Sequence, residues 1–197
     1  MNKRLDIMVD LETLGRDPQN PVIQIGAIAF DVVTGAKYSE FVEYCILDAK
    51  VTPINPDTYK WWLDTNTILL QDLLKRGLDS GITEAQMFER FVKWIEKTAK
   101  ANGIAKGDVH LWGNGILFDN YIIRGKCEMY GLKYPIPYQN DKDVRTIVDA
   151  YCTKAHMTRN EVVILFKNAS GLVQHDAIND CQIQINMVRH CYTTLTR

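Results

Sequence analysis

The sequence of 197 residues lacks the patterns that mark several large classes of protein. No apolar run approaches the roughly 18 residues of a membrane-spanning helix, so no membrane span is expected. The four histidines lie far apart without HExxH spacing, and no GxxxxGK[ST] nucleotide-binding loop is present. The five cysteines are odd in number and contain no CxxC pair, which argues against a disulfide framework or a zinc ribbon.

The chain also has no excess of charge of one sign. It carries 23 Lys and Arg against 24 Asp and Glu, a formal net charge of −1. A non-specific nucleic-acid binder usually shows a basic excess, so positive charge for such a partner must be local or supplied by bound metal. The N-terminus enters a strand pattern without the apolar segment and cleavage site of a signal peptide, and the cytoplasm is the expected compartment.

The patterns that are present predict one α/β domain over residues 1–197. Apolar or alternating runs predict strands at residues 5–11, 21–31, 38–47 and 108–112. Helical spacing and capping residues predict helices from near residue 55, at 68–75, 83–102, 117–130 and 143–153, and from 177 to about 192. Residues 157–174 are the least regular stretch, expected to form a loop or a short helix. Three strands followed by helices that a further strand interrupts predict a mixed sheet flanked by helices.

Two carboxylates interrupt the first predicted strand, in the segment MVDLETLG. Residues two apart share a face of a strand, so Asp10 and Glu12 point to one side while Val9 and Leu11 point to the other. Two like charges so placed repel each other, and burial raises their pKa values further. The alternative is a strand end at the surface with both acids solvated.

Two further segments carry an acid at the start of a helix. WGNGILFDN (112–120) delivers Asp119 to the first turn of a helix, where its charge suits the helix dipole. HDAIND (175–180) holds His175 and Asp180 five residues apart, which on a helix is about 140° around the axis. Both can face one cleft only if the histidine lies on the loop or at the helix edge. Taken singly, a helix-stabilising acid, a capping histidine and a solvated aspartate are the alternatives.

Together, the carboxylates Asp10, Glu12, Asp119 and Asp180 predict a metal site. Oxygen ligands select Mg²⁺ or Mn²⁺ rather than zinc. Two such ions about 3.5–4 Å apart can clamp the attacking and leaving oxygens of a phosphoryl displacement. Two divalent cations would offset the four negative charges, including those of Asp10 and Glu12 in the strand.

These motifs, in this order, resemble the DEDDh (DnaQ-like) 3′–5′ exonucleases of the ribonuclease H-like superfamily. Asp10 and Glu12 match the first motif, Asp119 the second, and His175 with Asp180 the third. The resemblance runs from residue 8 to about residue 192. The segments WGNGILFDN and DVRTIV (143–148) and the Trp61–Trp62 pair look most like the short phage-type exonucleases. The five-residue spacing from Asn114 to Asp119 argues against a proofreading subunit.

The resemblance implies a role for each motif residue. Asp10, Glu12 and Asp180 would hold the metal that binds the attacking water. Asp10, with Asp119 directly or through water, would hold the second metal at the leaving 3′ oxygen. His175 would take a proton from the water, a task that suits histidine, whose ordinary pKa is about 6.5. The product would be a nucleoside 5′-monophosphate.

The resemblance also implies substrate contacts next to these acids. The backbone of Thr13 would meet the terminal 3′-hydroxyl, and Leu14 would wedge against the last base, with ordinary packing as the alternative for Leu14. Asn114 would hold the second motif, touch the substrate or serve only as a turn residue. One of Trp61 and Trp62 would offer a stacking platform for a base while the other belongs to the core.

The expected substrate is single-stranded DNA or RNA with a free 3′ end, with DNA favoured by the phage-type resemblance and short RNA as the alternative. Three other functions fit less well. A serine hydrolase would need a GxSxG elbow, which is missing. A non-catalytic 3′-end-binding module would not need all four acids and the histidine, and that histidine argues against an internally cutting enzyme. A homodimer is expected, because several relatives are dimers and a net charge near zero does not oppose association.

Overall fold

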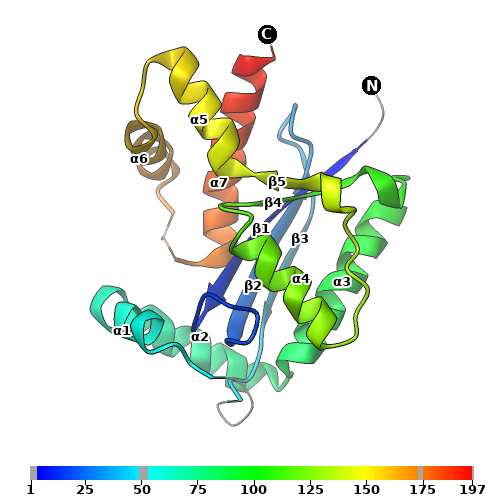
Figure 1. Cartoon of the computed structure of the whole chain (residues 1–197), viewed down its shortest axis with the longest axis vertical. Helices are drawn as coiled ribbons and strands as arrows, with labels where there is room; N and C mark the ends of the chain where they lie inside the picture. Colours follow the sequence, from blue (N-terminus) through cyan, green and yellow to red (C-terminus); the bar gives the residue numbers. More distant parts are fainter. Residues whose placement is uncertain (1–3, 49–52, 173–174, 197) are drawn as a thin grey trace.

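The computed structural model describes residues 4–48, 53–172 and 175–196. In these residues five strands form one mixed sheet in the order β3-β2-β1-β4-β5 (Figure 1). The strands are β1 (Leu5–Thr13), β2 (Val22–Phe30), β3 (Lys37–Tyr44), β4 (Val109–Gly113) and β5 (Asp141–Asp143). β1 pairs antiparallel with β2 and parallel with β4, so it lies at the centre of the sheet. The four predicted strands are confirmed, and β5, three residues long, is too short to show a pattern in the sequence.

Seven α-helices accompany the sheet in the described residues. They are α1 (Pro56–Thr65), α2 (Thr67–Ser80), α3 (Glu84–Ala101), α4 (Asp119–Met129), α5 (Val144–Ala155), α6 (Arg159–Ser170) and α7 (Ala177–Leu195). The predicted start of α1 is confirmed, with Asn55 as the N-cap and Pro56 in the first turn. The capping box of Thr83 and Gln86 opens α3 as predicted. α2 is longer than predicted, because it continues to Gly81, which ends it in a left-handed conformation.

The two faces of β1 serve two different layers. The side chains of Leu5, Ile7, Val9 and Leu11 join the core cluster formed with α3 and α4. Met8, between them, belongs to the opposite cluster with α5 and α7. The predicted alternation is therefore confirmed, and it turns Asp10 and Glu12 toward the layer that contains α7.

The stretch 157–174, expected to form a loop or a short helix, contains a helix of 12 residues. α6 has a capping box of its own, in which Thr158 accepts from the backbone of Glu161 and the Glu161 carboxylate accepts from the backbone of Thr158. Only Val162 of this helix is buried, so its apolar periodicity is weak in the sequence. α6 packs against α5 and α7 (Figure 1). The end of the predicted stretch, residues 173 and 174, lies outside the described residues.

Two further properties bear on earlier predictions. Among the described residues, no helix has both the length and the hydropathy that crossing a membrane requires. The five cysteines are all free thiols and all buried.

Candidate active site

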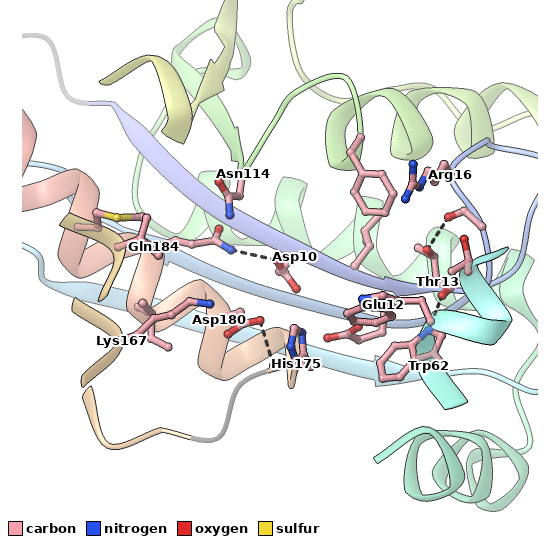
Figure 2. Close-up of a pocket in the computed structure, with 18 of the residues that line it drawn as sticks. Asp10, Glu12, Thr13, Arg16, Trp62, Asn114, Lys167, His175, Asp180 and Gln184 are labelled. Carbon is pink, nitrogen blue, oxygen red and sulfur yellow. Dashed lines mark hydrogen bonds between the residues drawn. The ribbon is translucent and has the colours of Figure 1, made fainter. Parts of the chain in front are cut away.

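A pocket of about 430 Å³ lies where β1 ends, between the start of α7, α6 and α1. Its lining includes Asp10, Glu12, Asn114, His175 and Asp180, so residues from all three predicted motifs meet there (Figure 2). A register shift in the pairing of β1 with β2 falls between Glu12 and Thr13, at the edge of the pocket. Such irregularities redirect side chains near active sites.

A glycine opposite Asp10 lets the helix α7 approach the sheet. Gly26 of β2 pairs directly with Asp10 of β1. A Cβ atom at Gly26 would lie 2.6 Å from the backbone carbonyl carbon of Ala177, the first residue of α7. The absence of a side chain at Gly26 therefore brings the N-terminal turn of α7, with Asp180, close to Asp10.

Three of the four predicted metal ligands converge. Asp10, Glu12 and Asp180 each offer a carboxylate oxygen, and these oxygens lie within 4.8 Å of one another. Burial raises the pKa of Asp10 and of Glu12 well above the usual values, and the surrounding carboxylates raise both further. Burial also raises the pKa of Asp180. A divalent cation would offset this repulsion, so the three oxygens fit such an ion.

The fourth predicted ligand, Asp119, is not part of this group of three, but in addition to burial its charge contributes to the raised pKa of Asp10. The side chain of Asp119 is buried and its Oδ2 accepts a hydrogen bond from the backbone N–H of Asn114 at 3.2 Å. Burial raises its pKa to about 7, against the lowering effect of the backbone donors around it. Asp119 begins α4, as predicted, but it is not among the described residues that line the pocket. Gly113 leaves room for the start of α4, since a Cβ there would collide with Oδ1 of Asn120 and lie 3.1 Å from Cβ of Asp119.

His175 stands just before α7, on the loop as its spacing from Asp180 requires. Its backbone is left-handed, with φ of 62°, and its N–H donates to Oδ2 of Asp180 at 3.2 Å. Its ring lies edge-on to Trp61, with centroids 5.3 Å apart. The imidazole thus faces the pocket beside the carboxylates, held through its backbone by one of them (Figure 2).

The residues next to the first motif divide between pocket and core. Thr13 lines the pocket, and its carbonyl accepts a hydrogen bond from Nε1 of Trp62 at 2.9 Å. Both tryptophans line the pocket, but Trp62 is only 1% exposed and belongs to a core cluster, whereas Trp61 is 42% exposed, so Trp62 is the core member of the pair. Leu14 is also 1% exposed, packs in a cluster with Trp62, and is absent from the described pocket lining. The geometry favours the packing alternative for Leu14 over the wedge.

The pocket also contains residues that the motifs did not reveal. Arg159, Val163 and Lys167 stand four residues apart and line it from one face of α6. Arg16 adds a third cationic side chain from the loop after β1, and Gln184 of α7 donates to Asp10. The spacing of the α6 residues was readable in the sequence, but only once a helix was assigned there.

Comparison with known families agrees with this geometry. The family model described as the 3′–5′ exoribonuclease Rv2179c-like domain matches residues 5–192. This chain belongs to that family. It is a 3′–5′ exonuclease domain, a phosphodiester hydrolase, and the resemblance to the DEDDh class is confirmed. The closer resemblance to phage-type members stays a prediction.

Solved structures with the same fold include several nucleases. The nuclease domain of 3′hExo, a DEDDh family member bound to rAMP, has a TM-score of 0.62 at 16% identity, covering 97% of this exonuclease domain and 92% of that chain. Cell-death related nuclease 4 (CRN-4) has a TM-score of 0.71 at 15% identity, covering 97% and 64%. E. coli Exonuclease I with a dT13 oligonucleotide has a TM-score of 0.71 at 17% identity, covering 99% and 42%. The exonuclease domain thus spans less than half of Exonuclease I. A search of curated protein sequences found no significant match.

Proposed function

We propose that this chain shortens single-stranded nucleic acid from its 3′ end by metal-dependent hydrolysis and releases nucleoside 5′-monophosphates. The observation that carries the proposal is the convergence of Asp10, Glu12 and Asp180 within 4.8 Å beside His175, in one pocket of a 3′–5′ exoribonuclease family member. A binding module has no need for such a costly cluster of buried and half-buried acids.

The donor set supports two Mg²⁺ or Mn²⁺ ions. All the proposed ligands are carboxylates, and after burial the charges of Asp119 and Asp180 both raise the pKa of Asp10. Asp10, Glu12 and Asp180 would hold one ion, and Asp10 with Asp119, directly or through water, the other. When bound, the two ions supply positive charge to the attacking and leaving oxygens.

The remaining residues of the site would deprotonate the attacking water or position the substrate and the acids. His175 takes the proton of the attacking water, and its backbone bond to Asp180 keeps the ring at the edge of the acidic group. The backbone of Thr13, fixed by Trp62, meets the terminal 3′-hydroxyl. Asn114 holds Asp119 through its N–H and lines the pocket next to the substrate.

The rim of the pocket suits a single strand. Trp61 offers an exposed ring for a base to stack on, and Arg159 and Lys167 offer positive charge for phosphates. Because the chain has a net charge of −1, positive charge for a nucleic acid has to be gathered locally, and these two side chains provide it at the pocket. Arg16, on the other side of the acids, extends the same charge across the site.

RNA is the substrate to test first, because the matching family is described as exoribonuclease. DNA, which the phage-type resemblance favours, is the alternative, and E. coli Exonuclease I was solved with DNA oligonucleotides. Sequence-matched RNA and DNA oligomers labelled at the 5′ end, digested with Mg²⁺, should both give ladders that shorten from the 3′ end, with RNA lost faster. Faster loss of DNA would reverse the proposed preference for RNA and leave the proposed 3′–5′ hydrolysis in place.

Three controls decide the reaction itself. Blocking the 3′-hydroxyl should slow the ladder, EDTA should abolish it, and Mg²⁺ or Mn²⁺ should restore it. Immediate release of the 5′ label as a mononucleotide would show the opposite polarity. Undiminished cleavage in EDTA would show that the acids do not work through a metal.

Two finer proposals concern the protein as a whole. We place it in the cytoplasm, where buried cysteines such as those found here remain reduced. We also propose a homodimer, and a monomer mass from light scattering at micromolar concentration would refute it.

A further inference from the structure

A glutamine on α7 contacts the acid at the centre of the site. Gln184 lies one helical turn after Asp180, so both side chains project toward the same pocket. Its Nε2 donates to Oδ1 of Asp10 at 2.9 Å (Figure 2). This hydrogen bond occupies one of the two oxygens of the Asp10 carboxylate and so limits how that carboxylate can turn in the pocket.

The other end of the same amide is unusual. Gln184 is only 4% exposed, and its Oε1 is buried without a hydrogen-bond partner among the described residues. A buried acceptor without a partner costs free energy, so a site that keeps one has a use for it. The amide lines the pocket, where a water could supply the missing donor.

We propose that Gln184 is a positioning residue for Asp10 and, through it, for both cations. The amide N–H fixes the Asp10 carboxylate by one oxygen and adds no charge to an already acidic site. The free Oε1 accepts a hydrogen bond from water in the pocket. The inference rests on the proposed function, because Asp10 is the ligand that the two ions would share.

A neutral donor is well suited to this position. A lysine or arginine would repel the cations, and a further acid would add negative charge beside the three carboxylates already gathered there. Groups that orient metal ligands from behind typically change metal affinity by about 10–100-fold when removed. Gln184 acts at the ligand whose position affects both ions, so its removal should fall in that range.

The test measures metal binding directly. Mn²⁺ binding to the full chain is titrated by calorimetry without nucleic acid, for the wild type, Gln184→Met and Gln182→Met. Methionine keeps the length of the side chain and removes its donor and acceptor. Gln182 is a matched control on the same helix, since its Nε2 bonds Asn186 at 3.0 Å outside the pocket. Melting temperatures in EDTA report on folding separately.

Gln184→Met should weaken Mn²⁺ binding by about 10–100-fold, and Gln182→Met should leave it unchanged. If Gln184→Met does not fold, Gln184→Asn keeps the amide but shortens it by one methylene, and the same weakening is expected. A role in packing alone would lower the melting temperature and leave Mn²⁺ affinity within about threefold of the wild type, which would overturn the inference. Absence of Mn²⁺ binding by the wild type would overturn the metal-dependent function as well.

Discussion

The floor of the pocket and its α6 wall differ in charge, burial and support. The floor is acidic and consists of Asp10 and Glu12 on the central strand, held between neighbouring strands and α7, together with buried Asp119 at the start of α4. The wall is basic and consists of exposed Arg159 and half-buried Lys167 on a helix with one buried residue. The proposed metal ligands thus lie on or beside the sheet, and the cationic side chains proposed to contact phosphates lie on a helix with few buried residues.

This difference predicts two kinds of effect. Changes to the floor should remove the chemical step and leave nucleic-acid binding by the wall in place. Changes to the wall, or to Trp61 at the rim, should weaken nucleic-acid binding and leave the chemical step intact once substrate is bound. Changes to the wall should also lower the salt dependence of that binding.

The largest effect is expected at the floor, from Asp10→Ala. Activity should fall to background, because this acid is the ligand shared by both proposed ions. The melting temperature in EDTA should rise, since removing one buried acid relieves the repulsion that raises the pKa of Glu12. Asp149→Ala, at an exposed acid on α5, should retain full activity. Full activity of Asp10→Ala would rule out the site.

His175→Ala should have the next largest effect. General base catalysis contributes about 10²–10⁴-fold, so single-turnover rates at saturating Mn²⁺ should fall by that factor while Mn²⁺ affinity stays unchanged. The rise of the wild-type rate with pH should flatten in the variant. His190→Ala, an exposed histidine bonded to Tyr151, is the control. If the two pH profiles share one shape and differ by less than about tenfold, His175 is not the base.

At the rim, Trp61→Ala should weaken binding and spare chemistry. A base stacked on an aromatic ring contributes about 1–3 kcal/mol, or about 5–150-fold in Kd. Binding is best measured by fluorescence anisotropy in the Asp10→Ala background, where the strand is not degraded. Tyr59→Ala, 44% exposed on the same helix but outside the described pocket lining, should change little. Equal Kd values for both variants would remove Trp61 from the substrate site.

The wall should be visible in the salt dependence of binding. Each phosphate contact contributes about 0.7 to the slope of log K against log salt for a single strand. Arg159→Ala and Lys167→Ala should each lower the slope by about that amount. Lys97→Ala, at an exposed lysine of α3 on the other face of the sheet, should not. Unchanged slopes for both α6 variants would show that the strand leaves the pocket by another route.

The same contrast explains what could be predicted from the sequence. The floor was predictable, because strand alternation places Asp10 and Glu12 on one side and a turn followed by a helix presents Asp119. The approach of Asp180 to Asp10 depends on Gly26, because a side chain there would collide with Ala177 at the start of α7. No local sequence pattern reveals that contact. Asp10, Glu12 and Asp180, which were predicted to share one ion, bring their oxygens within 4.8 Å of one another, whereas Asp119, predicted to share the second ion with Asp10, accepts a hydrogen bond from the backbone of Asn114.

The wall was not predicted, because the local sequence pattern of α6 is weak. α6 has weak apolar periodicity, with Ile164 and Leu165 46% and 56% exposed, so its stretch could be assigned only as a loop or a short helix. The capping box of Thr158 and Glu161 was the available signal. The sequence also could not tell which of Trp61 and Trp62 is buried, because that depends on the tertiary packing of their helix.

The smallest effect, a change in stability with pH, separates floor from wall without any substrate. Burial raises the pKa of Asp119 to about 7, whereas an aspartate in the unfolded chain titrates near 3.9. Between about pH 4 and 7 the folded protein therefore binds more protons than the unfolded chain, and its stability in EDTA should fall as pH rises through that window. Above about pH 7 this contribution should level off.

Asp119→Asn removes that difference in proton binding and keeps the shape of the side chain. Its melting temperature in EDTA should depend less on pH between 5 and 8 than that of the wild type, and should be higher at pH 8. Arg159→Ala, at the exposed end of the wall, should follow the wild-type curve. Saturating Mn²⁺ should reverse the trend for the wild type, because cation binding requires ionised acids and so stabilises more as pH rises. Parallel curves for the wild type and Asp119→Asn in EDTA would mean that Asp119 is ionised throughout, and that the floor carries its charge without needing a proton or a cation to offset it.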